Sequence, residues 1–172
     1  MSRFRLAEES DARALVRLHN SVADDLTSKL GQGYWSHQRS LRAQRDRIRR
    51  SERRPDSSLI YVLDERPDIA ASVVLTTKRA PFWRKRMWRE PEAQSICVYD
   101  LAVAPEREGT GLGRQAMLIA EDLARSIGLK YVRLDAFAQN PRSTGFYRHI
   151  GYEDRGELLV GGVRLILFEK RV

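Results

Sequence analysis

The 172-residue chain is poor in cysteine and histidine, and it contains no long apolar run. Its single cysteine, Cys97, excludes an internal disulfide framework and any cysteine-rich zinc site. The histidines, at positions 19, 37 and 149, are too scattered to indicate a metal cluster. No segment approaches the roughly 18–20 apolar residues that span a bilayer, and the N-terminus lacks the apolar stretch of a secretory signal. We therefore expect a cytoplasmic protein with no metal site and no membrane partner.

The residue present in excess is arginine, which supplies 26 of the 31 basic residues, against 23 acidic ones and a net charge of +8. This surplus favours an anionic partner, such as a phosphate-bearing cofactor, a nucleic acid or an acidic substrate, or else it reflects a solvated basic surface. With 42% hydrophobic residues, the chain can bury one core. We predict a single domain over residues 1–172.

Two segments concentrate the charge. Seven of the thirteen positions from 42 to 54 are arginine, which predicts a polar surface helix with a narrow apolar seam, closed by Pro55. Its outer face is either solvated or a docking surface for an anionic acceptor. In residues 78–89, Phe82, Trp83 and Trp88 alternate with cations, which indicates either a stacking-plus-phosphate site or aromatics folded over the edge of the core.

Hydrophobic periodicity predicts a mixed α/β (α+β) domain in the order β-α-α-β-β-β-α-β-α-β-β. The first helix is expected to begin at Ser10 or Asp11, either of which can cap it, and to carry His19 at the edge of the core. The expected strands cover residues 4–7, 58–63, 69–76, 95–104, 131–137, 158–160 and 163–170. The two later helices are expected over 113–127 and 141–150, the second capped by Asn140.

One segment carries a phosphate-binding pattern. From Asp100 the sequence is DLAVAPEREGTGLGR: a strand ends, Pro105 opens a loop, glycines follow at 109, 111 and 113, and a helix begins. Such a loop turns backbone N–H groups towards one point, and the helix adds its positive N-terminal dipole. The spacing is neither that of a nucleotide P-loop nor that of a dinucleotide fingerprint.

In context, this loop resembles the acetyl-CoA loop of the GNAT superfamily of N-acetyltransferases. The pattern L-x-V-x-P-x-x-x-G-x-G-x-G is matched by Leu101, Val103, Pro105, Gly109, Gly111 and Gly113. A second family pattern, about thirty residues further on, is matched by Asn140, Ser143, Gly145, Phe146, Tyr147, Gly151 and Tyr152. The match is clear from Ser95 to Tyr152, and the order of elements extends it over the whole chain.

The resemblance implies the GNAT fold, a mixed and mostly antiparallel sheet of six to seven strands, splayed at the cofactor site and flanked by about four helices. It also implies acetyl transfer from acetyl-CoA to a primary amine by direct attack in a ternary complex. In this family the pyrophosphate lies on the glycine loop and the pantetheine arm on the preceding strand. The cofactor-binding residues implied are Leu101, Ala102, Val103, Arg107, Glu108, Gly109, Thr110, Gly111, Leu112, Gly113, Arg114, Asn140, Arg142, Ser143, Phe146 and Tyr147.

By the same resemblance, Tyr147 is the acid that protonates the departing thiolate. The base is open: Asp100, Tyr99 and Cys97 are candidates on the preceding strand, and ordered water is the alternative. Asp135, on the strand after the helix that follows the loop, is a second carboxylate candidate. Asp100 lies in a YDLAV string similar to one in the aminoglycoside 3-N-acetyltransferase branch, near the reaction centre. It acts either as the base, as the orienter of a water, or only as a carboxylate that caps a helix or braces a loop. Cys97 is better explained as a small core residue.

The loop departs from the family pattern at Glu108, where arginine or glutamine is usual. A carboxylate beside a pyrophosphate is repulsive unless it points outward or pairs with Arg107, Arg114 or Arg142. The backbone amides, rather than this side chain, form the phosphate cradle, so the departure affects the expected cofactor affinity and not the fold.

The family builds its acceptor site from the first helices and the loop before the fourth strand, here residues 21–54 and 78–94. The candidate substrate-binding residues are Tyr34, Trp35, Trp83 and Asp135. Asp24 and Asp25 are too few carboxylates for a polycationic acceptor among so many cations, which favours a neutral or carboxylate-bearing small amine. The alternatives are acetylation of a macromolecule (aminoacyl-tRNA or a protein N-terminus) and a non-catalytic CoA- or nucleic-acid-binding module, and a homodimer is left open.

Overall fold

A computed structural model describes residues 4–54, 58–65 and 67–172, so the predicted helix stop at Pro55 lies outside the described residues. The chain divides into two compact units. Unit 1 comprises the residues as far as Leu75 together with Asp100–Met117, and unit 2 comprises Thr76–Tyr99 and Leu118–Val172. The strands are hydrogen-bonded in the order β1-β2-β3-β4-β5-β7-β6. Strand β4 (Ser95–Val103) and helix α3 (Leu112–Ser126) contribute residues to both units.

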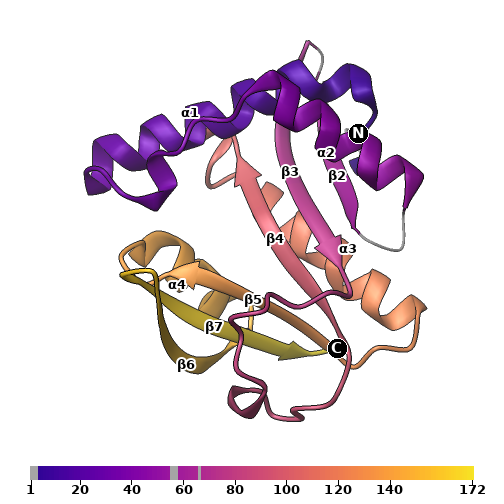
Figure 1. Cartoon of the computed structure of the whole chain (residues 1–172), viewed down its shortest axis with the longest axis vertical. Helices are drawn as coiled ribbons and strands as arrows, with labels where there is room; N and C mark the ends of the chain where they lie inside the picture. The colour runs from indigo at the N-terminus through magenta and orange to yellow at the C-terminus, as the bar shows by residue number, and fades with distance from the viewer. Residues whose placement is uncertain (1–3, 55–57, 66) are drawn as a thin grey trace. The chain divides into compact units, whose positions relative to one another are not determined.

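Unit 1 is built on three antiparallel strands, β1 (Phe4–Leu6), β2 (Leu59–Glu65) and β3 (Asp68–Thr76). All residues of β3 after the first are buried, as its apolar and β-branched sequence predicts. Helices α1 (Ala12–Leu30) and α2 (Leu41–Arg53) pack against one another (Figure 1).

The start of α1 differs from the predicted cap. A short 3₁₀ turn over Glu9–Asp11 precedes the helix, and no side chain caps α1 itself. The Asp11 carboxylate instead accepts a hydrogen bond from the backbone N–H of Glu8, at 2.8 Å, and pairs with the Arg5 guanidinium, at 2.7 Å. The charge of Arg5 competes for the carboxylate, so Asp11 braces β1 against the turn rather than capping the helix.

Helix α2 confirms the predicted polar helix, but its narrow buried face is mostly polar, whereas the sequence predicts an apolar seam. The Ser40 hydroxyl caps it by accepting the N–H of Ala43 at 3.2 Å. Its buried positions are Gln44, Ile48 and Ser51, spaced by three or four residues, as one helical face requires. The outward positions are exposed arginines: Arg42, Arg45, Arg49 and Arg53.

Unit 2 is built on the N-terminal half of β4 with β5 (Tyr131–Phe137), β7 (Val163–Arg171) and β6 (Glu153–Val160). Strands β4 and β5 are parallel, and the other pairs are antiparallel. Helix α4 (Pro141–His149) connects β5 to β6. The core holds Trp83 and Trp88 with Cys97 and Leu167, so these tryptophans of the basic loop fold inwards. Within the described residues, the seven strands and four α-helices follow each other in the predicted order.

Candidate functional site

The glycine loop lies in unit 1 and joins β4 to α3. A 3₁₀ turn over Pro105–Arg107 follows β4, and α3 begins at Leu112. Gly109 and Gly111 have φ angles of 76° and 85°, a conformation that side chains disfavour. A Cβ at either position would meet no atom within 4 Å, so internal packing does not require glycine here. The positive φ angles favour glycine at both positions, and the absence of a side chain leaves open space beside the backbone.

The N-terminus of α3 supplies donors for an anion. The first described helical hydrogen bond runs from the Gln115 N–H to the Gly111 carbonyl, at 3.0 Å. The N–H groups of Leu112, Gly113 and Arg114 precede it and therefore have no partner within the helix. Together with the helix dipole and the open glycine backbone, they suit an anion such as a phosphate group, and binding of the coenzyme A pyrophosphate here remains a prediction.

The charged side chains around this loop pair differently from the prediction. Arg107 forms an ion pair with Glu65 of β2, and Lys29 of α1 lies 3.8 Å from the Glu108 carboxylate. One cation near the Glu108 carboxylate is thus a lysine, whereas the partners that the sequence suggests are Arg107, Arg114 and Arg142. A phosphate contact from Arg107 remains a prediction, and it would require this guanidinium to share its donors with Glu65.

Asp100, also in unit 1, lies between two arginines. Its backbone has a φ of 49°, which aspartate tolerates better than most residues. The Arg39 guanidinium lies 3.0 Å from one carboxylate oxygen, and that of Arg47 lies 2.5 Å from the other. Burial raises the pKa of Asp100, but the two positive charges outweigh burial and hold it below its usual value. Such a carboxylate is a weak proton acceptor, which favours the bracing alternative over the base.

His19 of α1 is packed beside this cluster. Its Nε2 lies 3.2 Å from the Ser72 hydroxyl of β3. Burial, followed by the charge of Arg39, lowers the pKa of His19 to about 3. The imidazole is therefore neutral at pH 7, in agreement with its predicted place at the edge of the core.

The low pKa of His19 predicts a pH dependence of stability. As the pH falls below about 6.5, the unfolded chain takes up a proton on this histidine while the folded chain does not, so stability present above pH 6.5 is lost towards pH 3. The loss reaches at most about 1.4 kcal/mol per pH unit. In His19→Gln, the fall in Tm between pH 6.5 and 5 should be smaller than in the parent, as measured by calorimetry. Parallel curves would contradict the assignment.

In unit 2, residues predicted for substrate binding and catalysis lie together. The Trp83 indole N–H donates to the Asp135 carboxylate at 2.7 Å, and the Tyr99 ring stacks on Trp83 with a centroid distance of 5.6 Å. The Tyr99 hydroxyl donates to the Lys78 carbonyl at 3.3 Å. Trp83 is only 2% exposed, which leaves little of its surface for a substrate. Direct contact remains a prediction, and the geometry favours Trp83 as the support of Tyr99 and Asp135.

Tyr147 lies on α4, whose N-terminus is capped by Asn140: its side-chain oxygen accepts the N–H of Ser143 at 3.2 Å. The ring is 7% exposed and packs against Phe146 and Phe168, at centroid distances of 5.1 and 5.5 Å. Burial, then the negative charge of Asp135 in the same unit, raises the pKa of Tyr147 well above its usual value. The phenol therefore keeps its proton throughout the neutral range.

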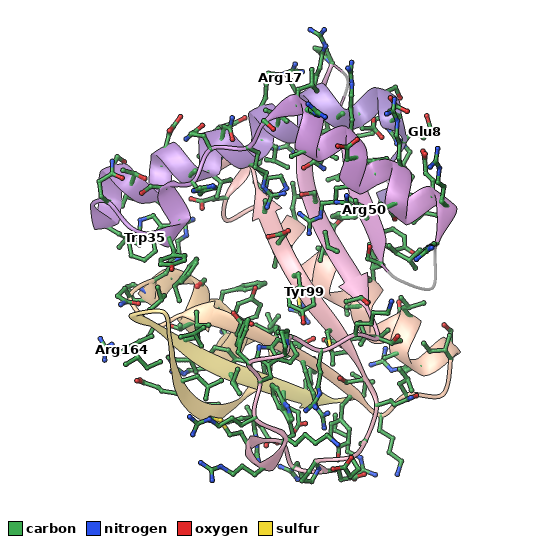
Figure 2. The ribbon with its side chains drawn as sticks, viewed as in Figure 1. Glu8, Arg17, Trp35, Arg50, Tyr99 and Arg164 are labelled. Carbon is green, nitrogen blue, oxygen red and sulfur yellow. The ribbon has the colours of Figure 1, made fainter. Side chains whose placement is uncertain are left out.

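The remaining candidates have clear environments. Tyr34 is 65% exposed, and the Trp35 indole N–H donates to the Gly31 carbonyl at 2.9 Å, in the segment that follows α1 (Figure 2). Cys97 is buried, and burial raises the pKa of its thiol to about 11, as suits a core residue rather than a nucleophile. The described part of the chain contains no group of three metal-ligating side chains and no helix suited to crossing a membrane.

Comparison with known proteins gives a consistent result. A family model described as the acetyltransferase (GNAT) family matches residues 16–152. The uncharacterized N-acetyltransferase YesJ of Bacillus subtilis is 30% identical over 114 residues, which cover 66% of this chain and 61% of that relative. Thus the match spans about three fifths of the length of that curated relative.

Solved structures share the fold over the whole chain. A ribosomal-protein-alanine N-acetyltransferase from Brucella melitensis superposes with a TM-score of 0.73 at 20% identity and covers 99% of both chains. The PaiA N-acetyltransferase from Thermoplasma acidophilum, solved in complex with coenzyme A, has a TM-score of 0.76 at 15% identity and covers 100% of this chain and 99% of its own.

Sequence reasoning missed Arg39 and Arg47 as site residues. The arginine-rich sequence predicts that Arg47 belongs to the outer face of a surface helix. In the structure it lies between Gln44 and Ser51, on the buried side of α2. The signal that could have found it is the helical spacing itself, since position 47 shares its face with 44, 48 and 51. Arg39 precedes the helix, and no periodicity marks it.

Proposed function

We propose that this chain, which belongs to the acetyltransferase (GNAT) family, transfers the acetyl group of acetyl-CoA to the primary amine of a small molecule by direct attack. The family uses acetyl-CoA as its donor. The observation that carries the proposal is the glycine loop, where positive φ angles at Gly109 and Gly111 lead directly into the N-terminus of α3. Bound acetyl-CoA would supply the thioester, whose carbonyl carbon accepts the amine and whose sulfur departs.

Unit 1 carries the binding groups. The backbone N–H groups of Leu112, Gly113 and Arg114 hold the pyrophosphate, and Leu101–Val103 of β4 align the pantetheine arm. Since backbone groups do this work, Glu108 is tolerated, with Lys29 offsetting its charge. Thr110, whose hydroxyl donates to the Arg107 carbonyl at 2.6 Å, stabilises the turn of the loop.

Unit 2 carries the acid. As the new C–N bond forms and the C–S bond breaks, the Tyr147 phenol donates its proton to the departing sulfur. Because burial raises the pKa of Tyr147 well above its usual value, the phenol carries its proton throughout the neutral range and has it available for the departing sulfur. The proton lost by the amine passes to water rather than to Asp100, because the charges of Arg39 and Arg47 make that carboxylate a weak proton acceptor.

Acetylation of a macromolecule is the second candidate function, and the outer face of α2 favours it. This face carries Arg42, Arg45, Arg49 and Arg53, and a surface cavity of about 460 Å³ lies along it. A row of exposed guanidinium groups suits a phosphate backbone, as in an aminoacyl-tRNA acceptor. Arg49, however, pairs with Glu9 at 2.6 Å, which reduces the free charge of the row.

The test of both candidates is release of free CoA thiol with three classes of acceptor: small amines, peptides and aminoacyl-tRNA. We expect turnover with small amines that depends on acetyl-CoA and saturates. The second candidate would be established instead if the enzyme preferred aminoacyl-tRNA and this preference weakened steeply with salt. The double substitution Arg42→Gln and Arg45→Gln should then abolish the preference. Binding of coenzyme A without thiol release from any acceptor would contradict both.

A further inference from the structure

The cluster around Asp100 holds more positive than negative charge. Two guanidinium groups, of Arg39 and Arg47, converge on one carboxylate, and the neutral His19 beside them adds no charge. Two guanidinium groups offer about ten N–H donors, whereas a carboxylate accepts at about four lone-pair positions. The cluster therefore has donors to spare and a surplus of one positive charge.

The surplus charge is accessible. The side chains of Arg39 and Arg47 are 26% and 31% exposed, so each is partly desolvated yet can be reached from outside. Gln44 faces Arg39 with its side-chain oxygen at 3.4 Å, which holds that guanidinium in place without neutralising it. A partly buried cation without a full counter-charge favours an anionic ligand.

The position of the cluster in the chain connects it to the reaction. Asp100 directly precedes Leu101–Val103, the stretch of β4 proposed to align the pantetheine arm. Strand residues advance about 3.3 Å each, so a ligand held at Asp100 lies within about one or two residues of that stretch. Because the cluster is cationic, it repels polyamines, and it accommodates an amine that brings its own negative charge.

From this arrangement we infer that the acceptor is an amine bearing a carboxylate close to the amino group, as in an α-amino acid, and that Arg39 and Arg47 bind that carboxylate. The inference rests on the proposed function and names the substrate class of the same site. Asp100 is a positioning residue, because it holds the two guanidinium groups side by side while the acceptor carboxylate takes their remaining donors.

The test compares α-amino acids with their primary amides, in which a neutral carboxamide replaces the carboxylate, by thiol release with acetyl-CoA and with each rate divided by the fraction of neutral amine. We expect kcat/KM to favour the acids by at least about tenfold, the size of a charge-assisted contact. Arg39→Gln and Arg47→Gln should reduce this preference to within about twofold of unity, because each variant lowers kcat/KM for the acids more than for the amides. Arg50→Gln, an exposed position on the same helix, is the matched control and should retain the full preference.

A binding measurement separates this inference from the proposed function. In the presence of coenzyme A, N-acetyl amino acids, the expected products, should bind with an affinity that Arg47→Gln lowers by about tenfold by calorimetry. Such binding without any turnover would support the carboxylate site and contradict the transferase. Equal rates for acids and amides, a preference that survives in both arginine variants, or product binding that is absent or independent of Arg47 would overturn the inference.

Discussion

Tyr147→Phe is expected to lower kcat by about 10²–10³-fold and to leave KM for acetyl-CoA within about twofold of the parent value. The substitution removes the hydroxyl group. The departing sulfur must then leave as an unprotonated thiolate or take its proton from water. Ground-state binding should change little, because the ring and its contacts with Phe146 and Phe168 remain. Steady-state thiol release over a range of acetyl-CoA concentrations measures both constants.

The matched control is Tyr152→Phe, which removes a hydroxyl from the same aromatic cluster. The Tyr152 ring lies 6.1 Å from that of Tyr147, and its hydroxyl donates to the buried Glu121 at 3.3 Å. Its loss should destabilise the fold by about 1–2 kcal/mol and leave kcat unchanged, because Lys170 still pairs with Glu121 at 2.8 Å. If both variants lost activity equally, or if Tyr147→Phe kept the parent kcat, the acid role of Tyr147 would be refuted.

The order and kind of the elements could be predicted because they depend on local patterns. The alternating and β-branched strands, the apolar stripe of α3 and the proline-initiated α4 are each specified within ten to twenty residues, and the structure confirms them. The start of α1 could not be predicted in the same way. Asp11 is a good capping residue by sequence, but Arg5, which belongs to a neighbouring strand, takes its carboxylate.

The contacts of the site that join residues far apart in the chain could not be predicted from the sequence. The sequence leaves the role of Asp100 open between base and brace, and the structure places it against two arginines more than fifty residues earlier in the chain. The same holds for Lys29, which lies near Glu108. Ion pairs between separate elements depend on tertiary packing, and no local pattern in a single amino-acid sequence indicates them.

The tryptophans of the basic loop illustrate how burial resolves an ambiguity that composition leaves. Aromatic residues among cations suit either a site that stacks on a ligand or a loop that covers the edge of the core. The same residues support both interpretations, so the sequence does not distinguish them. The structure places Trp83 and Trp88 in edge-to-face contact, with ring centroids 5.3 Å apart, within the core of unit 2. Of the two, Trp83 contacts candidate site residues: its indole N–H donates to Asp135 and its ring stacks on Tyr99.

Gly111→Ala is expected to raise the Kd for coenzyme A by at least about tenfold and to lower the free energy of unfolding by about 1–2 kcal/mol. The loss of stability follows from the φ of 85°, which an L-residue with a Cβ adopts only with strain. The loss of affinity has a separate cause. The added methyl group meets no protein atom within 4 Å, so it occupies the open space in which the pyrophosphate must approach the backbone. Calorimetric titration with coenzyme A and denaturant unfolding measure the two effects.

Gly128→Ala separates strain from loss of the cradle. Gly128 has a φ of 73°, its Cβ would also meet nothing within 4 Å, and it lies just beyond the C-terminus of α3, at the opposite end of that helix from the glycine loop. It should lose a similar 1–2 kcal/mol of stability and bind coenzyme A as the parent does. Equal loss of affinity in the two variants would mean that strain alone weakens binding, and the assignment of the pyrophosphate to the glycine loop would then fail.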